Sequence, residues 1–294
     1  MVASNLDSDS WSEYWSKGFS SSFAGDKYSG AIADHWRSTL GGLPDGAAVL
    51  DLCCGNGSIF RLLDKADQRR LKLHGVDYAK LPLSKDDSFI LQGGVNIEDL
   101  PFESGSFDMV ISQFGVEYAN VDAAFAEAER VLKPSRNISF ICHHPDSVIL
   151  QSNRVIYKCG EELINQAIPK LRHMCRGIDL IERGNPLGKP LADQYRERFN
   201  AVMDGLLRRY SQSLYDTGFP EALRKILQGK RNADCSARLE AFTSVFCQAQ
   251  KRLELLFVAA DNAVSIKADQ FAEGFKLKKF VDSDSRLLGS LVAS

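Results

Sequence analysis

A short glycine turn follows the first strongly apolar run of the chain, and its residues could bind a polar ligand. Asp51 lies near the end of that run, and Gly55 and Gly57 follow within the turn. Glycine lets the backbone approach a ligand closely, and the first amides of a helix suit polar groups. Asp77 ends the next apolar run, where a carboxylate could accept both hydroxyls of a ribose. Together these residues predict a site for a ribose-containing ligand.

Two well-known phosphate-binding patterns do not occur in this turn. The dinucleotide pattern Gly-x-Gly-x-x-Gly is absent, because Cys53 occupies the first glycine position and residues 59–62 offer no third glycine. The chain also lacks the Gly-Lys-Ser/Thr of a P-loop. The sequence therefore disfavours a nicotinamide dinucleotide and a nucleoside triphosphate as ligands.

Residues 47–143 alternate short apolar runs with amphipathic stretches, which is typical of a parallel sheet with helical crossovers. A helix is expected to start at 59–63, and Asp122 could cap another that ends before Lys133 and Pro134. The predicted fold class is therefore α/β, with a doubly wound, mostly parallel sheet. Strands are expected at 47–52, 73–76, 89–91, 107–112 and 138–142.

The rest of the chain has a different pattern. Apolar residues recur at helical spacing in the segment after residue 143 and most regularly over 236–263, while the last residues alternate around a turn at 282–284. The aromatic N-terminal residues argue against a disordered tail. Four segments follow: an N-terminal helical cover (1–46), a ligand-binding core (47–143), a helical insertion acting as a lid (144–235), and a last helix and hairpin completing the core (236–294).

Composition and charge exclude several classes of function. The 294 residues carry 36 basic and 38 acidic side chains, a net charge of −2, which argues against nucleic acid as a partner. The total hides a split: residues 1–150 have a net charge of −8, 151–235 of +5 and 236–294 of +1. The sequence shows neither a long apolar span nor a basic leader with an apolar core, which favours a cytoplasmic protein. The 7 cysteines form no CxxC pair, which favours reduced thiols over zinc sites or disulfides.

The core 47–143 resembles a class I S-adenosylmethionine-dependent methyltransferase, of the branch that includes quinone-biosynthesis and small-molecule methyltransferases. That resemblance implies a seven-stranded Rossmann-like sheet with a helical insertion after strand five and a terminal antiparallel pair. Five elements carry it in order: the turn 49–57, Asp77, the loop 96–102, the strand and its end 107–118, and the helix and turn 129–134.

The resemblance also implies roles for individual residues toward the cofactor. Backbone atoms of the glycine turn would hold the methionine end of the cofactor, and an acid before the turn would orient it. Other side chains would contact the carboxylate, the ribose, the adenine and the region of the methyl group. These residues are Cys53, Gly55 and Gly57 for the methionine end, Asp51 for the turn, Tyr28 for the carboxylate, Asp77 for the ribose, Tyr78, Asn96 and Ile97 for the adenine, and Gln113 and Phe114 beside the methyl group.

Three departures from the family pattern affect the expected geometry. Cys53 stands in place of the first glycine and restricts the backbone there. Ser135 and Arg136 replace the usual pair of glycines. Only eleven residues separate Asp77 from Phe89, so the crossover helix between these strands is expected to be short or missing.

The acceptor of the methyl group is expected beyond the carboxyl ends of the fourth and fifth strands. His143 or His144 could act as a general base there, or start the lid as structural histidines. Glu117 and Tyr118 could fix a substrate amine or hydroxyl, and the aromatic cover could close over a sulfonium cation. The residues of that cover assigned to the substrate side are Tyr14 and Trp15.

The sequence therefore predicts methyl transfer from S-adenosyl-L-methionine, yielding S-adenosyl-L-homocysteine, to an oxygen, nitrogen or sulfur nucleophile of a small molecule. The basic lid would suit an anionic substrate. No metal, nucleic acid or membrane is expected to take part, and the chain is expected to be a monomer or a homodimer. Two alternatives stay open: a protein or RNA methyltransferase that docks through the basic insertion, and a noncatalytic cofactor-binding interaction protein.

Overall fold

The computed structural model describes residues 8–22, 27–82, 88–228, 234–266 and 276–293. The chain divides into two compact units, which we call unit 1 (Met1–Leu150 and Leu255–Ser294) and unit 2 (Gln151–Glu254). Unit 2 begins and ends later than the predicted insertion 144–235. The later end arises because one long helix, α10 (Cys235–Val264), continues past the expected boundary.

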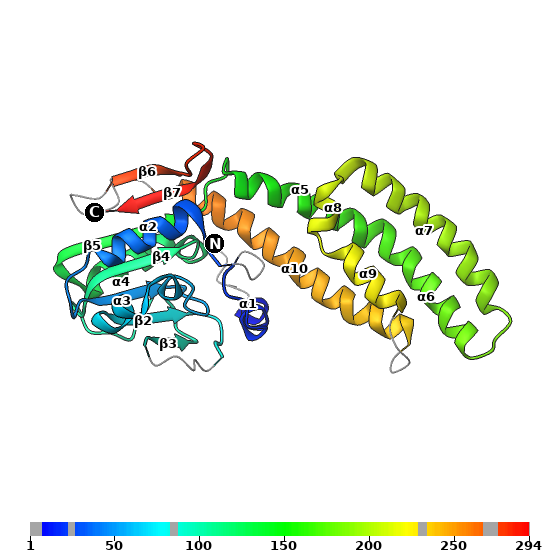
Figure 1. Cartoon of the computed structure of the whole chain (residues 1–294), viewed down its shortest axis with the longest axis horizontal. Helices are drawn as coiled ribbons and strands as arrows, with labels where there is room; N and C mark the ends of the chain where they lie inside the picture. The colour runs from blue at the N-terminus through cyan, green and yellow to red at the C-terminus, as the bar shows by residue number, and fades with distance from the viewer. Residues whose placement is uncertain (1–7, 23–26, 83–87, 229–233, 267–275, 294) are drawn as a thin grey trace. The chain divides into compact units, whose positions relative to one another are not determined.

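Unit 1 is built on a seven-stranded sheet with the order β3-β2-β1-β4-β5-β7-β6 (Figure 1). Strands β1 to β5 pair in parallel, and β7 is antiparallel to both β5 and β6. This confirms the doubly wound α/β fold and the terminal hairpin. The strands are β1 (Ala48–Leu52), β2 (Lys72–Asp77), β3 (Ile90–Gly93), β4 (Phe107–Gln113), β5 (Leu132–Cys142), β6 (Lys276–Val281) and β7 (Leu287–Ala293).

Helices pack on both faces of this sheet because successive strand side chains point to opposite faces. Val49 of β1 belongs to the apolar cluster that contains α2, whereas Leu50 belongs to the cluster that contains α4 and the end of α10. Trp36 of α2, fully buried, is the largest side chain on the first face. The helices of unit 1 are α1 (Ser8–Ser16), α2 (Gly30–Gly41), the short η1 (Phe60–Leu62), α3 (Lys65–Arg70), η2 (Val116–Tyr118) and α4 (Val121–Val131).

Two local details of this unit differ from the predictions. The glycine turn leads into the single 3₁₀ turn η1, whereas the α-helix α3 begins only after Asp64, whose side chain accepts the backbone N–H groups of Ala66 and Asp67. Asn120, not Asp122, caps α4, because its side chain accepts the N–H of Ala123. The chain between β2 and β3 forms no helix in its described residues 78–82 and 88–89.

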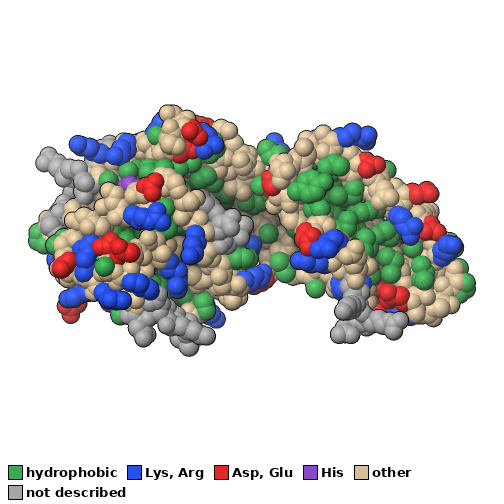
Figure 2. All heavy atoms as spheres, viewed as in Figure 1, with side chains coloured by type: hydrophobic (Ala, Val, Ile, Leu, Met, Phe, Trp, Pro, Cys, Tyr) green, Lys and Arg blue, Asp and Glu red, His purple; other side chains and the backbone are tan. Residues whose placement is uncertain are grey.

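Unit 2 is helical in all its described residues outside short turns, as its spacing predicts. Its core joins side chains from every helix of the unit, including the fully buried Leu163, Leu171 and Phe219. On the face seen in Figure 2, hydrophobic side chains gather beside interspersed acidic and basic ones. The helices are α5 (Val148–Glu162), the π-helical η3 (Leu163–Ala167), α6 (Ile168–Glu182), α7 (Gly188–Tyr210), α8 (Gln212–Asp216), α9 (Phe219–Gln228) and the first part of α10.

Within the described ranges, none of the helices combines the length and the apolar character that a bilayer crossing requires.

Candidate functional site

A pocket opens in unit 1 where β1, β2 and β4 end. The sheet order places the pocket where strand order reverses between β1 and β4, the position at which open α/β sheets bind ligands. The residues predicted from sequence that line it are Trp15, Tyr28, Asp51, Cys53, Asp77, Tyr78, Asn96, Ile97, Gln113, Phe114 and Tyr118.

The glycine turn is held to the end of β2 by Asp77. One carboxylate oxygen of Asp77 accepts the N–H of Gly55 over 2.8 Å, and the other accepts the N–H of Ala79 over 2.8 Å. Burial raises the pKa of Asp77 to about 6, although the two amide hydrogen bonds favour its charged form. Asp77 therefore positions the turn, and it also lines the pocket.

Gly55 and Gly57 shape the turn without lining the pocket. Both have positive φ values, 51° and 74°, and their amides are used inside the protein, by Asp77 and by the carbonyl of Cys54. Of the three residues predicted to hold the methionine end, Cys53 alone borders the pocket. Its neighbour Cys54 borders the pocket as well.

Asp51 is a buried carboxylate at the floor of the pocket. Within the described part of the chain, its Oδ2 atom has no hydrogen-bond partner, and the side chain is 1% exposed. Burial, and secondarily the nearby Asp77, raise its pKa well above the usual range. A buried acceptor left open in this way is costly unless a ligand satisfies it, and an ammonium group would do so.

Aromatic side chains from α1 form one wall of the pocket. The rings of Trp11 and Trp15 are stacked with centroids 6.0 Å apart, and Trp11 meets Tyr118 edge to face at 6.1 Å. Asn56 of the glycine turn anchors α1 because its side-chain amide donates to the carbonyls of Trp15 and Phe19. Tyr14, in contrast, lies behind this wall and donates its hydroxyl to the carbonyl of Ser21. Aromatic faces of this kind attract cations.

The residues expected beside an adenine also line the pocket. Ile97 is buried and Tyr78 is exposed. The Oδ1 atom of Asn96 accepts the N–H of Glu98 over 3.0 Å, so part of its acceptor capacity is already used within its own loop. Gln113 is fixed by the indole N–H of Trp36, which donates to its Oε1 atom.

Neither His143 nor His144 is among the described residues that line the pocket. The ring of His143 is stacked on Phe114 at 4.4 Å, and burial lowers its pKa to about 3. His144 uses its Nδ1 atom to accept the N–H of Asp146. The structure therefore places neither histidine at the pocket, and the general base stays a prediction.

Glu117 is likewise behind the pocket. Its side chain is fully buried, and its Oε1 atom accepts the backbone N–H of His143 over 2.7 Å. Burial raises its pKa to about 7. The prediction that Glu117 meets the substrate is not supported by this position, whereas Tyr118 does line the pocket.

Comparison with known families settles what this region is. Residues 50–140 match the family model described as a methyltransferase domain. This segment is a methyltransferase domain.

The methyltransferase domain has relatives among characterised proteins. The 2-phytyl-1,4-naphtoquinone methyltransferase of Thermosynechococcus vestitus is 29% identical over 141 residues, which cover 45% of this chain and 60% of the relative. The ubiquinone/menaquinone biosynthesis C-methyltransferase of Brucella abortus is 31% identical over 143 residues, covering 45% and 51%. The chain thus spans about half the length of the curated relatives it matches. Among solved structures, geranyl diphosphate C-methyltransferase from Streptomyces coelicolor aligns with a TM-score of 0.33 and 23% identity over 39% of this chain and 45% of that one.

Sequence patterns missed several residues that line the pocket of the methyltransferase domain. Ser58 and Ile59 directly follow the glycine turn, so their place after the motif was an available signal. Ser22 and Ala79 carried no such signal, since their positions depend on how α1 and the loop after β2 fold back. The full set that was missed is Ser8, Ser22, Cys54, Ser58, Ile59, Ala79, Gly115 and Ala119; Trp11, one of the aromatic N-terminal residues, also lines the pocket.

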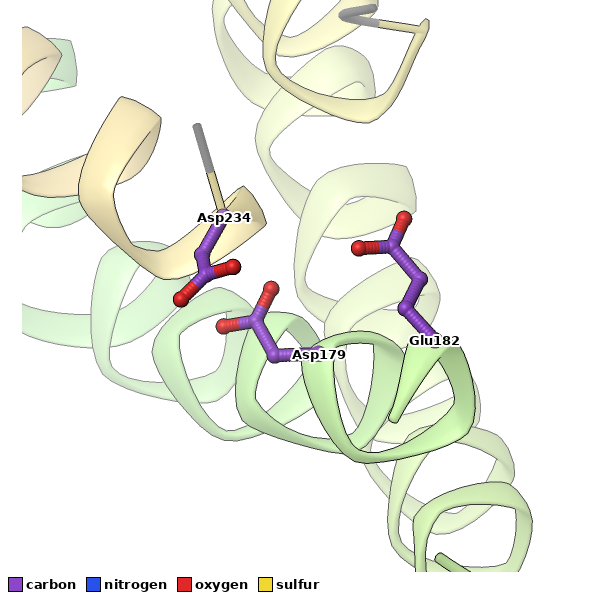
Figure 3. A group of neighbouring side chains, drawn as sticks. All are labelled: Asp179, Glu182 and Asp234. Atoms are coloured by element: carbon purple, nitrogen blue, oxygen red, sulfur yellow. The ribbon is translucent and has the colours of Figure 1, made fainter. Parts of the chain in front are cut away.

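Outside the methyltransferase domain, unit 2 brings together three carboxylates that are distant in sequence: Asp179, Glu182 and Asp234 (Figure 3). Asp179 accepts the N–H groups of Cys235 and Ser236 at the start of α10, and Asp234 pairs with Arg183. Asp179 and Asp234 therefore have structural partners.

Cys53 gives a first test of the turn. Its φ is 60°, a left-handed conformation that costs a non-glycine residue about 1–2 kcal/mol. We expect Cys53→Gly to raise the free energy of unfolding by about 1 kcal/mol, measured by urea denaturation, because glycine adopts this φ without strain. Cys54→Gly is the matched control: Cys54 is buried against Gly75, so losing its side chain should destabilise the protein. Equal losses from both substitutions would contradict the argument.

Glu117 gives a second test, through pH. An acid whose folded pKa, about 7, exceeds its unfolded value of 4.5 loses stability as pH rises through that window. The loss amounts to about 3 kcal/mol at 1.36 kcal/mol per pKa unit. We expect Glu117→Gln to remove this pH-dependent loss. Between pH 4.5 and 8, the unfolding free energy of the variant should therefore rise by this amount relative to that of the wild type.

The measurement is urea denaturation of both proteins across that pH range. The unfolding free energy of the wild type is subtracted from that of the variant at each pH. This cancels the opposite contribution of His143, which both proteins contain and whose depressed pKa removes stability as pH falls. Glu103→Gln, at an exposed position of the same unit, should follow the wild-type profile. A Glu117→Gln profile parallel to the wild type would show that Glu117 is ionised in the folded protein without cost.

Proposed function

We propose that the chain binds S-adenosylmethionine in the pocket of unit 1 and transfers its methyl group to a small molecule. The observation that carries this proposal is the open, buried oxygen of Asp51 at the floor of the pocket. It offers a negative acceptor for the ammonium group of the cofactor, in a chain segment that matches a methyltransferase domain.

Other residues of the pocket fit the remaining parts of this cofactor. Asp77, at the end of β2, keeps lone pairs for the ribose hydroxyls, and Ile97 with Tyr78 would border the adenine. Tyr28 presents a hydroxyl that is within 3.0 Å of the Ser22 hydroxyl and would meet the carboxylate end. Both ends of the cofactor therefore find groups of suitable chemistry along one pocket.

The cofactor brings an activated methyl group on a sulfonium, so the protein mainly has to align the acceptor. The wall of Trp11, Trp15 and Tyr118 would stabilise positive charge and exclude water. Because neither His143 nor His144 borders the pocket, the proposed reaction uses an acceptor that needs no histidine base. An oxygen, nitrogen or sulfur atom of low pKa would qualify, and so would an electron-rich ring carbon of the type that the names of the quinone methyltransferases imply.

The charge of unit 2 lends little support to an anionic substrate or to RNA docking. Several of its arginines pair with carboxylates of the same unit, among them Arg172 with Glu240 and Arg209 with Glu162. The visible face in Figure 2 mixes both signs of charge around hydrophobic side chains. Part of the basic charge of unit 2 is therefore paired within the unit itself.

Calorimetry tests the binding step first. We expect both S-adenosylmethionine and S-adenosylhomocysteine to bind the full chain at one site, and Asp51→Ala to lose most of that affinity. Turnover of labelled cofactor against a pooled metabolite extract, with mass spectrometry of the product, then identifies the acceptor atom. Failure of both ligands to bind would overturn the proposal, and binding without any turnover would leave a cofactor-binding protein.

A further inference from the structure

Two cysteines that are 60 positions apart in sequence meet inside unit 2. The Sγ atoms of Cys175, on α6, and Cys235, the first residue of α10, are 2.7 Å apart. Both side chains are fully buried within the core of the unit. A disulfide bond measures about 2.05 Å, so the two sulfurs are about 0.7 Å from bonding distance.

The contact does not depend on the sulfur atoms alone. Asp179, one helical turn after Cys175, accepts the N–H of Cys235 over 2.7 Å and that of Ser236 over 3.2 Å. In Figure 3 its carboxylate points from α6 toward the start of α10. The carboxylate thus caps α10 and fixes its first turn against α6, which keeps the two sulfurs facing each other.

The surroundings favour the thiolate on Cys235. The sulfur of Cys175 and the guanidinium of Arg238 lower the pKa of Cys235, and the positive end of the α10 helix dipole acts in the same direction. Burial, Asp179 and Glu182 oppose this effect and raise the pKa. The contact with Cys235, together with burial, raises the pKa of Cys175. Cys235 is therefore the better first nucleophile of the pair.

We propose that Cys175 and Cys235 are a redox modification site, which forms a reversible intramolecular disulfide with a small disulfide of the glutathione class as oxidant. In the first step the Cys235 thiolate attacks the small disulfide, whose S–S bond breaks and releases one thiolate. In the second step the deprotonated Cys175 attacks the Cys235 sulfur and displaces the second thiolate. The two protein thiols lose two electrons and two protons, and the small disulfide is reduced to two thiols.

Burial determines how this site behaves. An oxidant reaches the pair only when the first turn of α10 opens locally, since helix ends open more readily than the core. The product closes back into the apolar core, where it is shielded from reductant. Cys247, also on α10, is exposed and can only form a mixed disulfide with the same reagent, which makes it an internal measure of the reagent's action.

The test uses the full chain, incubated with oxidised glutathione, denatured, alkylated and digested for mass spectrometry. We expect the peptides of Cys175 and Cys235 to appear linked and to separate again with dithiothreitol. Apart from Cys247, the chain should lose two thiols that can be alkylated. In Cys175→Ala the second step is blocked, so Cys235 should accumulate a mixed disulfide with glutathione. Cys159→Ala, which alters another fully buried cysteine of the same core, should keep the linked pair.

Three results would overturn the proposal. One is that Cys175 and Cys235 stay alkylatable while Cys247 is modified. Another is that the wild-type chain holds glutathione on Cys235 without linking to Cys175. The third is that Cys235 links to a different cysteine.

Discussion

Replacing Asp77 with asparagine should weaken the binding of S-adenosylhomocysteine by about 100-fold. Both oxygens of Asp77 accept backbone N–H groups, one from Gly55 and one from Ala79. An asparagine supplies only one acceptor, so its NH₂ group must face one of these donors. The displaced turn amide lowers stability, whereas the loss of a charge-assisted hydrogen bond to the ribose costs binding about 2–3 kcal/mol, which corresponds to this loss of affinity. Calorimetry measures it directly.

The matched control for Asp77→Asn is Asp99→Asn, an exposed aspartate of the same unit that does not line the pocket. Its affinity should equal that of the wild type. Near-ultraviolet circular dichroism verifies that both variants keep their tertiary packing. If a folded Asp77→Asn protein binds as tightly as the wild type, Asp77 neither positions the turn nor contacts the ligand.

Gly55→Ala should disturb both the turn and the aromatic wall. A Cβ atom at Gly55 would overlap the ring of Trp15, and the φ of 51° is unfavourable for alanine. We expect a loss of about 3 kcal/mol in unfolding free energy, from the backbone conformation and the displaced ring together. We also expect binding of S-adenosylhomocysteine to fall by about tenfold or more as Trp15 moves, with a change in tryptophan fluorescence.

Gly94 provides a control that separates the two causes. It has a φ of 75°, but a Cβ atom there would meet no other atom within 4 Å. Gly94→Ala should therefore show only the backbone cost of about 1–2 kcal/mol and keep full affinity. In a Trp15→Ala background the clash is gone, so Gly55→Ala should then cost no more than Gly94→Ala. Equal effects of Gly55→Ala and Gly94→Ala in the wild-type background would contradict this, because the ring of Trp15 would then move aside at no energetic cost.

The sequence predicted the two acids of the pocket because parallel strands bring their carboxyl ends to one edge. Asp51 and Asp77 each end a buried run, and β1 pairs with β2, so their neighbourhood follows from the strand pattern alone. The alternation of apolar and amphipathic stretches likewise identified the fold class, since that pattern is governed by local burial.

Side-chain direction after the strands could not be predicted in the same way. Phe114 leaves β4 with a φ of 53°, which no propensity of phenylalanine indicates, and its ring then stacks on His143, which does not line the pocket. The same limit applies to the cysteines of unit 2. Their spacing along the chain shows no pattern, because the meeting of Cys175 with Cys235 depends on how α6 packs against the start of α10.

The pair of buried acids in the pocket has a consequence for ligand exchange. Asp51 and Asp77 both have raised pKa values, so the ligand-free pocket retains bound hydrogen ions at a pH where exposed carboxylates have lost theirs. A ligand with a fixed positive charge competes with those hydrogen ions for the same oxygens. Binding should then release acid into the medium, and the enthalpy observed by calorimetry should vary with the ionisation heat of the buffer.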